Sequence, residues 1–161
     1  MFCLFISPVF KKSFITFAGR KMSRILAIDF GQKRSGIAVT DDLQMIANPL
    51  TTVLSKDLID FLTKYIKEED VEVIVIGEPK TMDNKPSDST KYIQPFIGRL
   101  KKALPNVNID RMDERFTSRM AFQAMIDGGL GMKARRNKEL VDSISATLIL
   151  QSYMEYKKIK S

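Results

Sequence analysis

The sequence predicts an α/β domain: a mixed β-sheet of about five strands with helices on both faces. Three observations indicate this class. Three β-rich segments open the body of the chain, the run from Val71 to Ile76 is almost continuously apolar, and helix and strand patterns then alternate. An apolar run of this kind is typical of a strand that is covered on both faces in a parallel sheet.

The leading segments read as three short strands. Residues 24–30 are β-rich and end at Gly31, and residues 36–40 form a second strand after a turn over residues 32–34. Residues 49–54 form the third. The order of leading strands followed by helix–strand alternation predicts the mixed sheet.

Helix and strand patterns fill the remainder. Ser55 is the expected N-cap of a helix whose apolar residues recur at helical spacing through Ile66. After the strand at 71–76, a helix extends to about Ala103, and Pro95 predicts a late start or a kink in it. A strand at 107–112, a helix at 117–127 and a long final helix capped by Asn137 complete the order.

Composition excludes several kinds of chemistry. The 161 residues suit one domain, and they include no histidine, no tryptophan and one cysteine, Cys3. A Ser-His-Asp or Cys-His nucleophile, a histidine-bearing zinc site and an internal disulfide are therefore excluded. Enzymatic chemistry would have to rest on carboxylates, lysines or hydroxyls.

The net charge of +7 is unevenly distributed. Residues 1–22 contain four basic and no acidic residues, which leaves the body with 22 basic and 19 acidic residues. The body is mildly basic, so a nucleic-acid partner is permitted and not demanded. The apolar stretch within residues 1–22 is too short to span a membrane. We expect residues 1–22 to be an N-terminal extension that results from a start codon assigned too early, with a targeting or anchoring role as the alternative, and we expect a single domain over residues 23–158.

Carboxylates stand where ligands gather in α/β sheets. Asp29 ends the first strand, Asp113 and Glu114 follow the strand at 107–112, and Asp142 shares a helix face with small residues such as Ser145. Such carboxylates could hold one or two Mg²⁺ or Mn²⁺ ions, with water as the nucleophile. Each carboxylate also has a purely structural explanation. Asp29 could be a buried aspartate with its hydrogen bonds satisfied, and Asp113 and Glu114 could be exposed loop charges. Asp142 could be a solvated first-turn residue that interacts favourably with the helix dipole.

Basic residues cluster around these carboxylates. They suit contacts with phosphates, and the alternative is an ordinary solvated charge run. The candidates for binding nucleic acid are Lys33, Arg34, Arg115, Lys133, Arg135, Arg136 and Lys138.

Three motifs carry a family resemblance. Residues 28–41 (IDFGQKRSGIAVTD), 113–118 (DERFTS) and 141–151 (VDSISATLILQ) resemble, in order, the motifs of the YqgF family. These are ribonuclease-H-like proteins described as pre-16S rRNA nucleases and as Holliday-junction resolvase-like. The resemblance covers residues 23–156.

The resemblance implies a ribonuclease-H-like fold, a cytoplasmic bacterial protein and metal-dependent cleavage of structured nucleic acid during rRNA maturation. It implies that Asp29, Glu114 and Asp142 form the metal-binding and catalytic triad, with Glu114 preferred to Asp113. The implied cofactor is a pair of Mg²⁺ or Mn²⁺ ions. The implied partners are precursor rRNA and a ribosome or pre-ribosomal particle. The protein is expected to act as a monomer or homodimer and not to associate with a membrane. Glu78 departs from the family pattern, and so does the loop at 83–88 (DNKPSD), which lacks the usual glycine. Both departures bear on substrate preference.

Three other functions compete with the rRNA nuclease. Resolution of branched DNA would keep the chemistry and require a dimer with two active sites. A non-catalytic RNA- or ribosome-binding module would keep only the fold. A sugar-kinase or actin-like ATPase is disfavoured, because those folds enclose the nucleotide between two domains and this chain has room for one.

Overall fold

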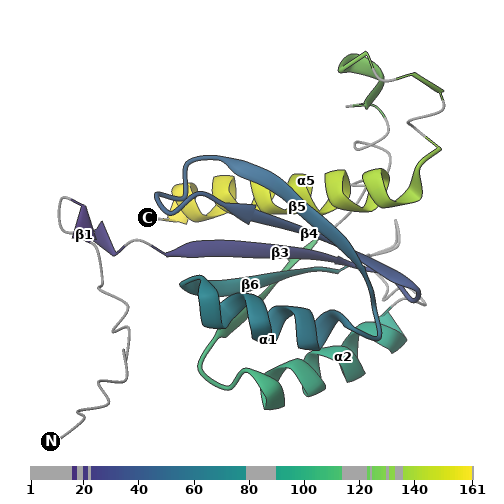
Figure 1. Cartoon of the computed structure of the whole chain (residues 1–161). Coiled ribbons are helices and arrows are strands. Elements are labelled where there is room, and N and C mark those ends of the chain that lie inside the picture. The colour runs from purple at the N-terminus through teal and green to yellow at the C-terminus, as the bar shows by residue number, and fades with distance from the viewer. Residues whose placement is uncertain are drawn as a thin grey trace, which may run out of the picture.

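The computed structural model describes residues 16–17, 20–21, 23–78, 90–113, 123, 125–129, 131–132 and 136–160. Its centre is a five-stranded sheet with helices on both faces (Figure 1). The strands are β3 (Arg24–Phe30), β4 (Arg34–Thr40), β5 (Ala47–Leu54), β6 (Val71–Glu78) and β7 (Asn108–Asp113). Two-residue strands, β1 (Thr16–Phe17) and β2 (Arg20–Lys21), pair with each other in a separate sheet.

The strand order β5-β4-β3-β6-β7 makes the sheet mixed, as the sequence predicts. β3 pairs antiparallel with β4, and β4 with β5, whereas β3–β6 and β6–β7 are parallel pairs. The carboxyl ends of β3, β6 and β7 therefore meet at one edge of the sheet. Ligand sites in open α/β sheets form at this edge.

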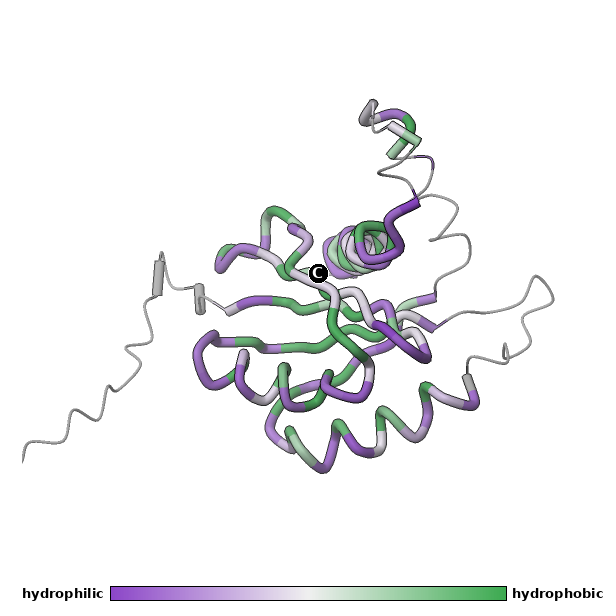
Figure 2. The backbone as a smooth tube through the Cα atoms, turned by 45° about the vertical axis from the view of Figure 1, so that its right-hand side comes forward, coloured by the Kyte–Doolittle hydropathy of each residue, from purple (hydrophilic) through white to green (hydrophobic). Residues whose placement is uncertain are grey.

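Alternating side chains divide the core between the two faces of the sheet. Leu26 and Ile28 of β3 pack toward α1 (Leu58–Glu68) and α2 (Thr90–Ala103) on the α1/α2 face. Ile25 and Ala27 pack toward α5 (Lys138–Lys160) on the α5 face. Figure 2 shows the strands as a largely hydrophobic layer between these helices. The continuous apolar run in β6 is thereby explained, because both of its faces are covered.

Two local predictions are corrected. The N-cap of α1 is Asp57 rather than Ser55, because the Ser55 hydroxyl donates to the Gly31 carbonyl (2.6 Å) and is not available to the helix. Of the two expectations for Pro95, a late start of the helix or a kink, the late start is wrong, because α2 begins at Thr90 and continues through Pro95. Pro95 lies near the start of the helix, where the missing N–H removes one bond to the first turn. The helix expected at 117–127 lies mostly outside the described residues.

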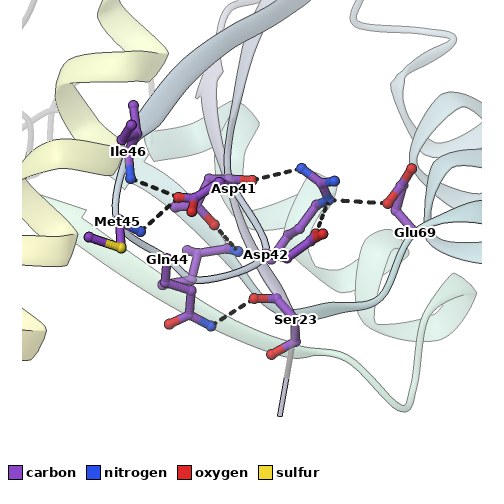
Figure 3. Close-up of polar contacts among 10 residues, drawn as sticks. Ser23, Asp41, Asp42, Gln44, Met45, Ile46 and Glu69 are labelled. Carbon is purple, nitrogen blue, oxygen red and sulfur yellow. Dashed lines mark hydrogen bonds and ion pairs between the residues drawn. The ribbon is translucent and has the colours of Figure 1, made fainter. Parts of the chain in front are cut away.

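The amino end of β3 is closed by a polar network (Figure 3). Asp41 Oδ1 accepts bonds from the backbone N–H groups of Met45 (2.7 Å) and Ile46 (2.8 Å), which shapes the turn between β4 and β5. Gln44, in the left-handed conformation at φ 55°, reaches across to the Ser23 carbonyl (3.0 Å). Asp41 thus stabilises this turn through its side chain.

Candidate active site at the carboxyl end of β3

Asp29 occupies the sheet edge where the parallel strands end. It pairs in register with Gly36 of β4, and it follows Ile25 and Ala27 on the α5 face by strand alternation. Its carboxyl group therefore points toward the side of the sheet that α5 covers. Figure 1 shows the first turns of α5 over the end of the sheet where β3 turns into β4.

Gly36 brings α5 onto the sheet. A Cβ atom at this position would lie 2.0 Å from the Asp142 carbonyl oxygen, so a side chain here is impossible without moving the helix. On the helix, the buried Ser145 and Ala146 are small enough for the same close approach. Because Gly36 is the register partner of Asp29, this contact sets Asp142 beside Asp29.

Arg34 links the strand to the helix carboxylate. Its Nε lies 3.5 Å from Asp142 Oδ2, and the two side chains are 33% and 29% exposed. Arg34 Nε is buried, and within the described residues it has no partner that meets hydrogen-bond geometry. The contact is an ion pair without the directed hydrogen bond that usually accompanies one.

Burial perturbs both carboxyl groups. Desolvation, followed by the negative charge of Asp142, raises the pKa of Asp29 to about 6, and the Ser145 hydroxyl opposes this rise. Desolvation also raises the pKa of Asp142 above its ordinary value, against the lowering effect of the Arg34 guanidinium. Two neighbouring carboxylates that resist ionisation are a recognised sign of a functional site.

The donor set fits a hard divalent cation. Asp29 and Asp142 supply carboxylate oxygens, the ligands that Mg²⁺ and Mn²⁺ prefer. Ser145 Oγ is buried beside the two carboxyl groups, and in the described part of the chain it has no hydrogen bond of ordinary geometry. The site therefore contains a buried polar group that the described residues leave without a hydrogen-bond partner. Across the residues that the structure describes, no group of three metal-binding side chains is found. Glu114, the third predicted ligand, lies outside them.

Asp113 lies on the other face of the sheet. In β7, Ile109 packs against the α1/α2 cluster and Met112 against the α5 cluster. Alternation therefore places Asp113 on the α1/α2 face, away from Asp29. Asp113 pairs in register with Glu78.

Glu78 also lies on the α1/α2 face. Arg111 of β7 lies 3.4 Å from its carboxylate and donates to Gln94 of α2 (3.0 Å). The residue that departs from the family pattern thus ends β6 beside the candidate site, but it does not join Asp29 and Asp142.

The described basic residues lie on the segments that carry the site or directly precede them. Lys33 is exposed in the turn before β4, and Arg136 and Lys138 are exposed at the start of α5. Lys138 lies near enough to Asp142 to lower the pKa of that carboxyl. Arg115, Lys133 and Arg135, also predicted to bind nucleic acid, lie outside the described residues.

Sequence reasoning missed two residues that build the site. The sequence pattern identifies Gly36 only as part of a strand and Ser145 only as a small residue on the helix face of Asp142. The available signals were a glycine inside a strand, which often marks close approach of another backbone, and a serine three residues after Asp142 on the same helix face.

No helix in the described ranges is long and apolar enough to cross a membrane.

Comparison with known proteins gives a family and relatives of known name. The model of the RuvX family, described as Holliday junction resolvase, matches residues 23–156. A protein of Phocaeicola vulgatus named "Putative pre-16S rRNA nuclease" is 58% identical over 137 residues, which cover 85% of this chain and 99% of the relative. A protein of Flavobacterium psychrophilum with the same name is 56% identical over 136 residues, covering 84% and 99%.

Solved structures share the fold. The chain is similar to T. thermophilus RuvC in complex with Holliday junction substrate, with a TM-score of 0.52 and 17% identity. The alignment covers 82% of this chain and 96% of that one. The similarity confirms the predicted ribonuclease-H-like, mixed-sheet α/β fold.

Proposed function

Because the chain belongs to the RuvX family, we propose that it is a metal-dependent nuclease that hydrolyses phosphodiester bonds of precursor 16S rRNA. The observation that carries this proposal is the meeting of Asp29 and Asp142 at the carboxyl end of β3, enforced by the contact of α5 with Gly36. The names of the relatives that match most of this chain support the substrate.

Asp29, Asp142 and Glu114 are proposed as the residues that hold one or two Mg²⁺ or Mn²⁺ ions. Ions bound there would activate water and neutralise charge on the phosphate undergoing attack. Asp29 is fixed by its strand and Asp142 by the first turns of α5, so both carboxylates are positioned before substrate arrives. Ser145 supplies a hydroxyl that faces the Asp29 carboxyl.

The third ligand is proposed to be Glu114 rather than Asp113. Strand alternation in β7 directs Asp113 to the α1/α2 face, away from Asp29, which leaves Glu114 as the candidate that the family motif offers. We therefore expect Glu114→Gln to abolish cleavage and Asp113→Asn to retain most of it. Equal loss in both variants would contradict this assignment.

The basic residues are proposed to position the substrate backbone. Arg34 and Lys138 act on Asp142, Lys33 and Arg136 are exposed on the segments before β4 and α5, and Arg115, Lys133 and Arg135 are assigned the same role from the sequence. Cations of this kind bind phosphates without reading sequence. Structured RNA would thus be recognised mainly through its backbone.

The proposed substrate also implies where the reaction takes place and which partner the protein meets there. Precursor rRNA is processed in the bacterial cytoplasm on pre-ribosomal particles, which we propose as the partner. Residues 23–158 are assigned as the catalytic domain and residues 1–22 as an extension that this chemistry does not require.

Branched DNA is the second candidate substrate. The description of the matching family as Holliday junction resolvase favours it. Symmetric cleavage of a four-way junction requires two active sites, so this function requires a homodimer.

The test is cleavage of precursor 16S rRNA and of a synthetic four-way DNA junction by the same protein, with Mg²⁺, Mn²⁺ or EDTA. Metal-dependent cutting of the RNA is expected. Cutting of the junction alone would favour the resolvase, and RNA binding without cutting under every metal condition would favour a non-catalytic binding module.

A further inference from the structure

Arg34 has a surprising position for a residue expected to contact substrate phosphates. Its Nε atom is directed into the protein and lies 3.5 Å from Asp142 Oδ2. That nitrogen is buried, and in the described part of the chain no acceptor meets hydrogen-bond geometry with it. A buried N–H without a hydrogen bond carries a free-energy cost, and here the attraction to Asp142 offsets it.

The charges of the site explain why a cation is needed at this place. Asp29 and Asp142 bring two carboxyl groups together in a partly buried space, where the charge of Asp142 opposes ionisation of Asp29. Arg34 is the main positive charge acting on Asp142, with a smaller contribution from Lys138. A side-chain cation thus partly neutralises a carboxylate that the proposed function gives to a divalent ion.

We propose that Arg34 is a displaceable counter-ion of Asp142: it neutralises this carboxylate in the metal-free protein and is released toward substrate phosphate when a divalent ion binds there. The inference rests on the proposed function. Arg34 begins β4 and its side chain is one-third exposed, so the guanidinium can turn outward without unpairing the strand.

This exchange couples the binding of metal and nucleic acid. A divalent ion that takes Asp142 frees Arg34 for a phosphate, and a phosphate that takes Arg34 frees Asp142 for the ion. Because coupling free energies are reciprocal, each ligand then increases the affinity for the other. The protein would bind neither ligand at its full affinity alone.

The first test is calorimetric titration with Mn²⁺ in the absence of nucleic acid. Removing the competing cation in Arg34→Gln is expected to tighten Mn²⁺ binding by about tenfold, as expected for a unit charge a few ångströms from the ligand. Arg34→Lys retains the charge and should bind within about threefold of wild type by the same reasoning. Lys33→Gln removes the neighbouring exposed charge and is the matched control, with little expected change.

Equal or weaker Mn²⁺ binding by Arg34→Gln, at unchanged melting temperature, would overturn the inference. If wild-type protein binds Mn²⁺ and cleaves RNA in that case, the proposed function stands and only the counter-ion role is lost. If neither the wild-type protein nor any variant binds Mn²⁺, the proposed metal-dependent function and the counter-ion role of Arg34 are both wrong.

The second test measures binding of a short single-stranded RNA in EDTA. Asp142→Asn should increase RNA affinity by releasing Arg34, and this gain should disappear in the Arg34→Gln background. The double-mutant cycle separates this effect from the general loss of a negative charge, which would be additive. Additive effects of the two substitutions would count against the exchange.

Discussion

Asp29 is a carboxyl group whose burial opposes its ionisation in the folded protein. Desolvation and Asp142 raise its pKa from 3.8 to about 6, so the folded state disfavours the carboxylate relative to the unfolded chain. The stability associated with the protonated form is complete below pH 3.8 and is lost as the pH rises through about 6. A bound cation would reverse this cost.

Asp29→Asn is therefore expected to stabilise the metal-free protein at alkaline pH. The shift corresponds to at most about 2–3 kcal/mol at pH 8, and less because the side chain is partly exposed. Thermal melting in EDTA at pH 4 and pH 8 checks this, since the variant should gain over wild type only at pH 8. A gain of the same size at both values would show that ionisation is not its cause.

Gly36 is the second residue on which the site depends. Gly36→Ala places a methyl group against the Asp142 carbonyl and should displace α5, with a loss of about 3 kcal/mol in the free energy of unfolding. Chemical denaturation measures this loss. Gly98→Ala is the matched control, because nothing lies within 4 Å of a Cβ there and alanine favours the helix by up to about 1 kcal/mol. Similar losses for the two variants would contradict the close-contact explanation.

At the scale of elements, α5 is held at both ends. Its first turns contact β4 at Gly36, and near its other end Lys157 donates to Glu72 of β6 and to Gln44 in the turn between β4 and β5 (3.3 Å). Ser23 donates to the same Glu72 (2.7 Å). These contacts fix the helix along the sheet and thereby fix Asp142 over β3.

Glu72→Gln tests the far attachment. Burial alone would raise the pKa of Glu72, but hydrogen bonds from Lys157, Ser23 and Gln44 outweigh it and leave the pKa below its ordinary 4.5. The stability that this carboxylate contributes is therefore present above pH 4.5 and lost as the pH falls through its lowered value.

The variant should lose about 1 kcal/mol at pH 7 and much less at pH 3, measured by urea denaturation, because the group is near the surface. Lys158→Gln, at an exposed position of the same helix, is the control and should change little. An unchanged Glu72→Gln protein at pH 7 would mean that the contact does not hold α5.

At the scale of the whole molecule, the sequence was enough to predict the sheet. β3 matches its predicted bounds, and the apolar run in β6 correctly indicated a strand covered on both faces. Ser145, expected on the same helix face as Asp142, is buried. These features follow from local periodicity, which a single sequence records directly.

Features that depend on tertiary register could not be predicted in this way. The face of Asp113 follows from the packing of Ile109 and Met112, and the pairing of Arg34 with Asp142 depends on where α5 crosses β4. The wrong N-cap has the same origin. Serine is a common N-cap residue, but the Ser55 hydroxyl forms hydrogen bonds with the Gly31 carbonyl and the Ser35 hydroxyl, which lie elsewhere in the sequence.

The most direct test of the proposed catalytic role of Asp29 and Asp142 is Mg²⁺-dependent cleavage of precursor 16S rRNA. The assay compares wild type, Asp29→Asn and Asp142→Asn, each shown to be folded. Asp60→Asn, an exposed aspartate on α1 at the other face, is the matched control. We expect cleavage by both site variants to fall to the background seen in EDTA, while Asp60→Asn cleaves like wild type. Full cleavage by either folded site variant would contradict the claim that Asp29 and Asp142 together form the catalytic centre.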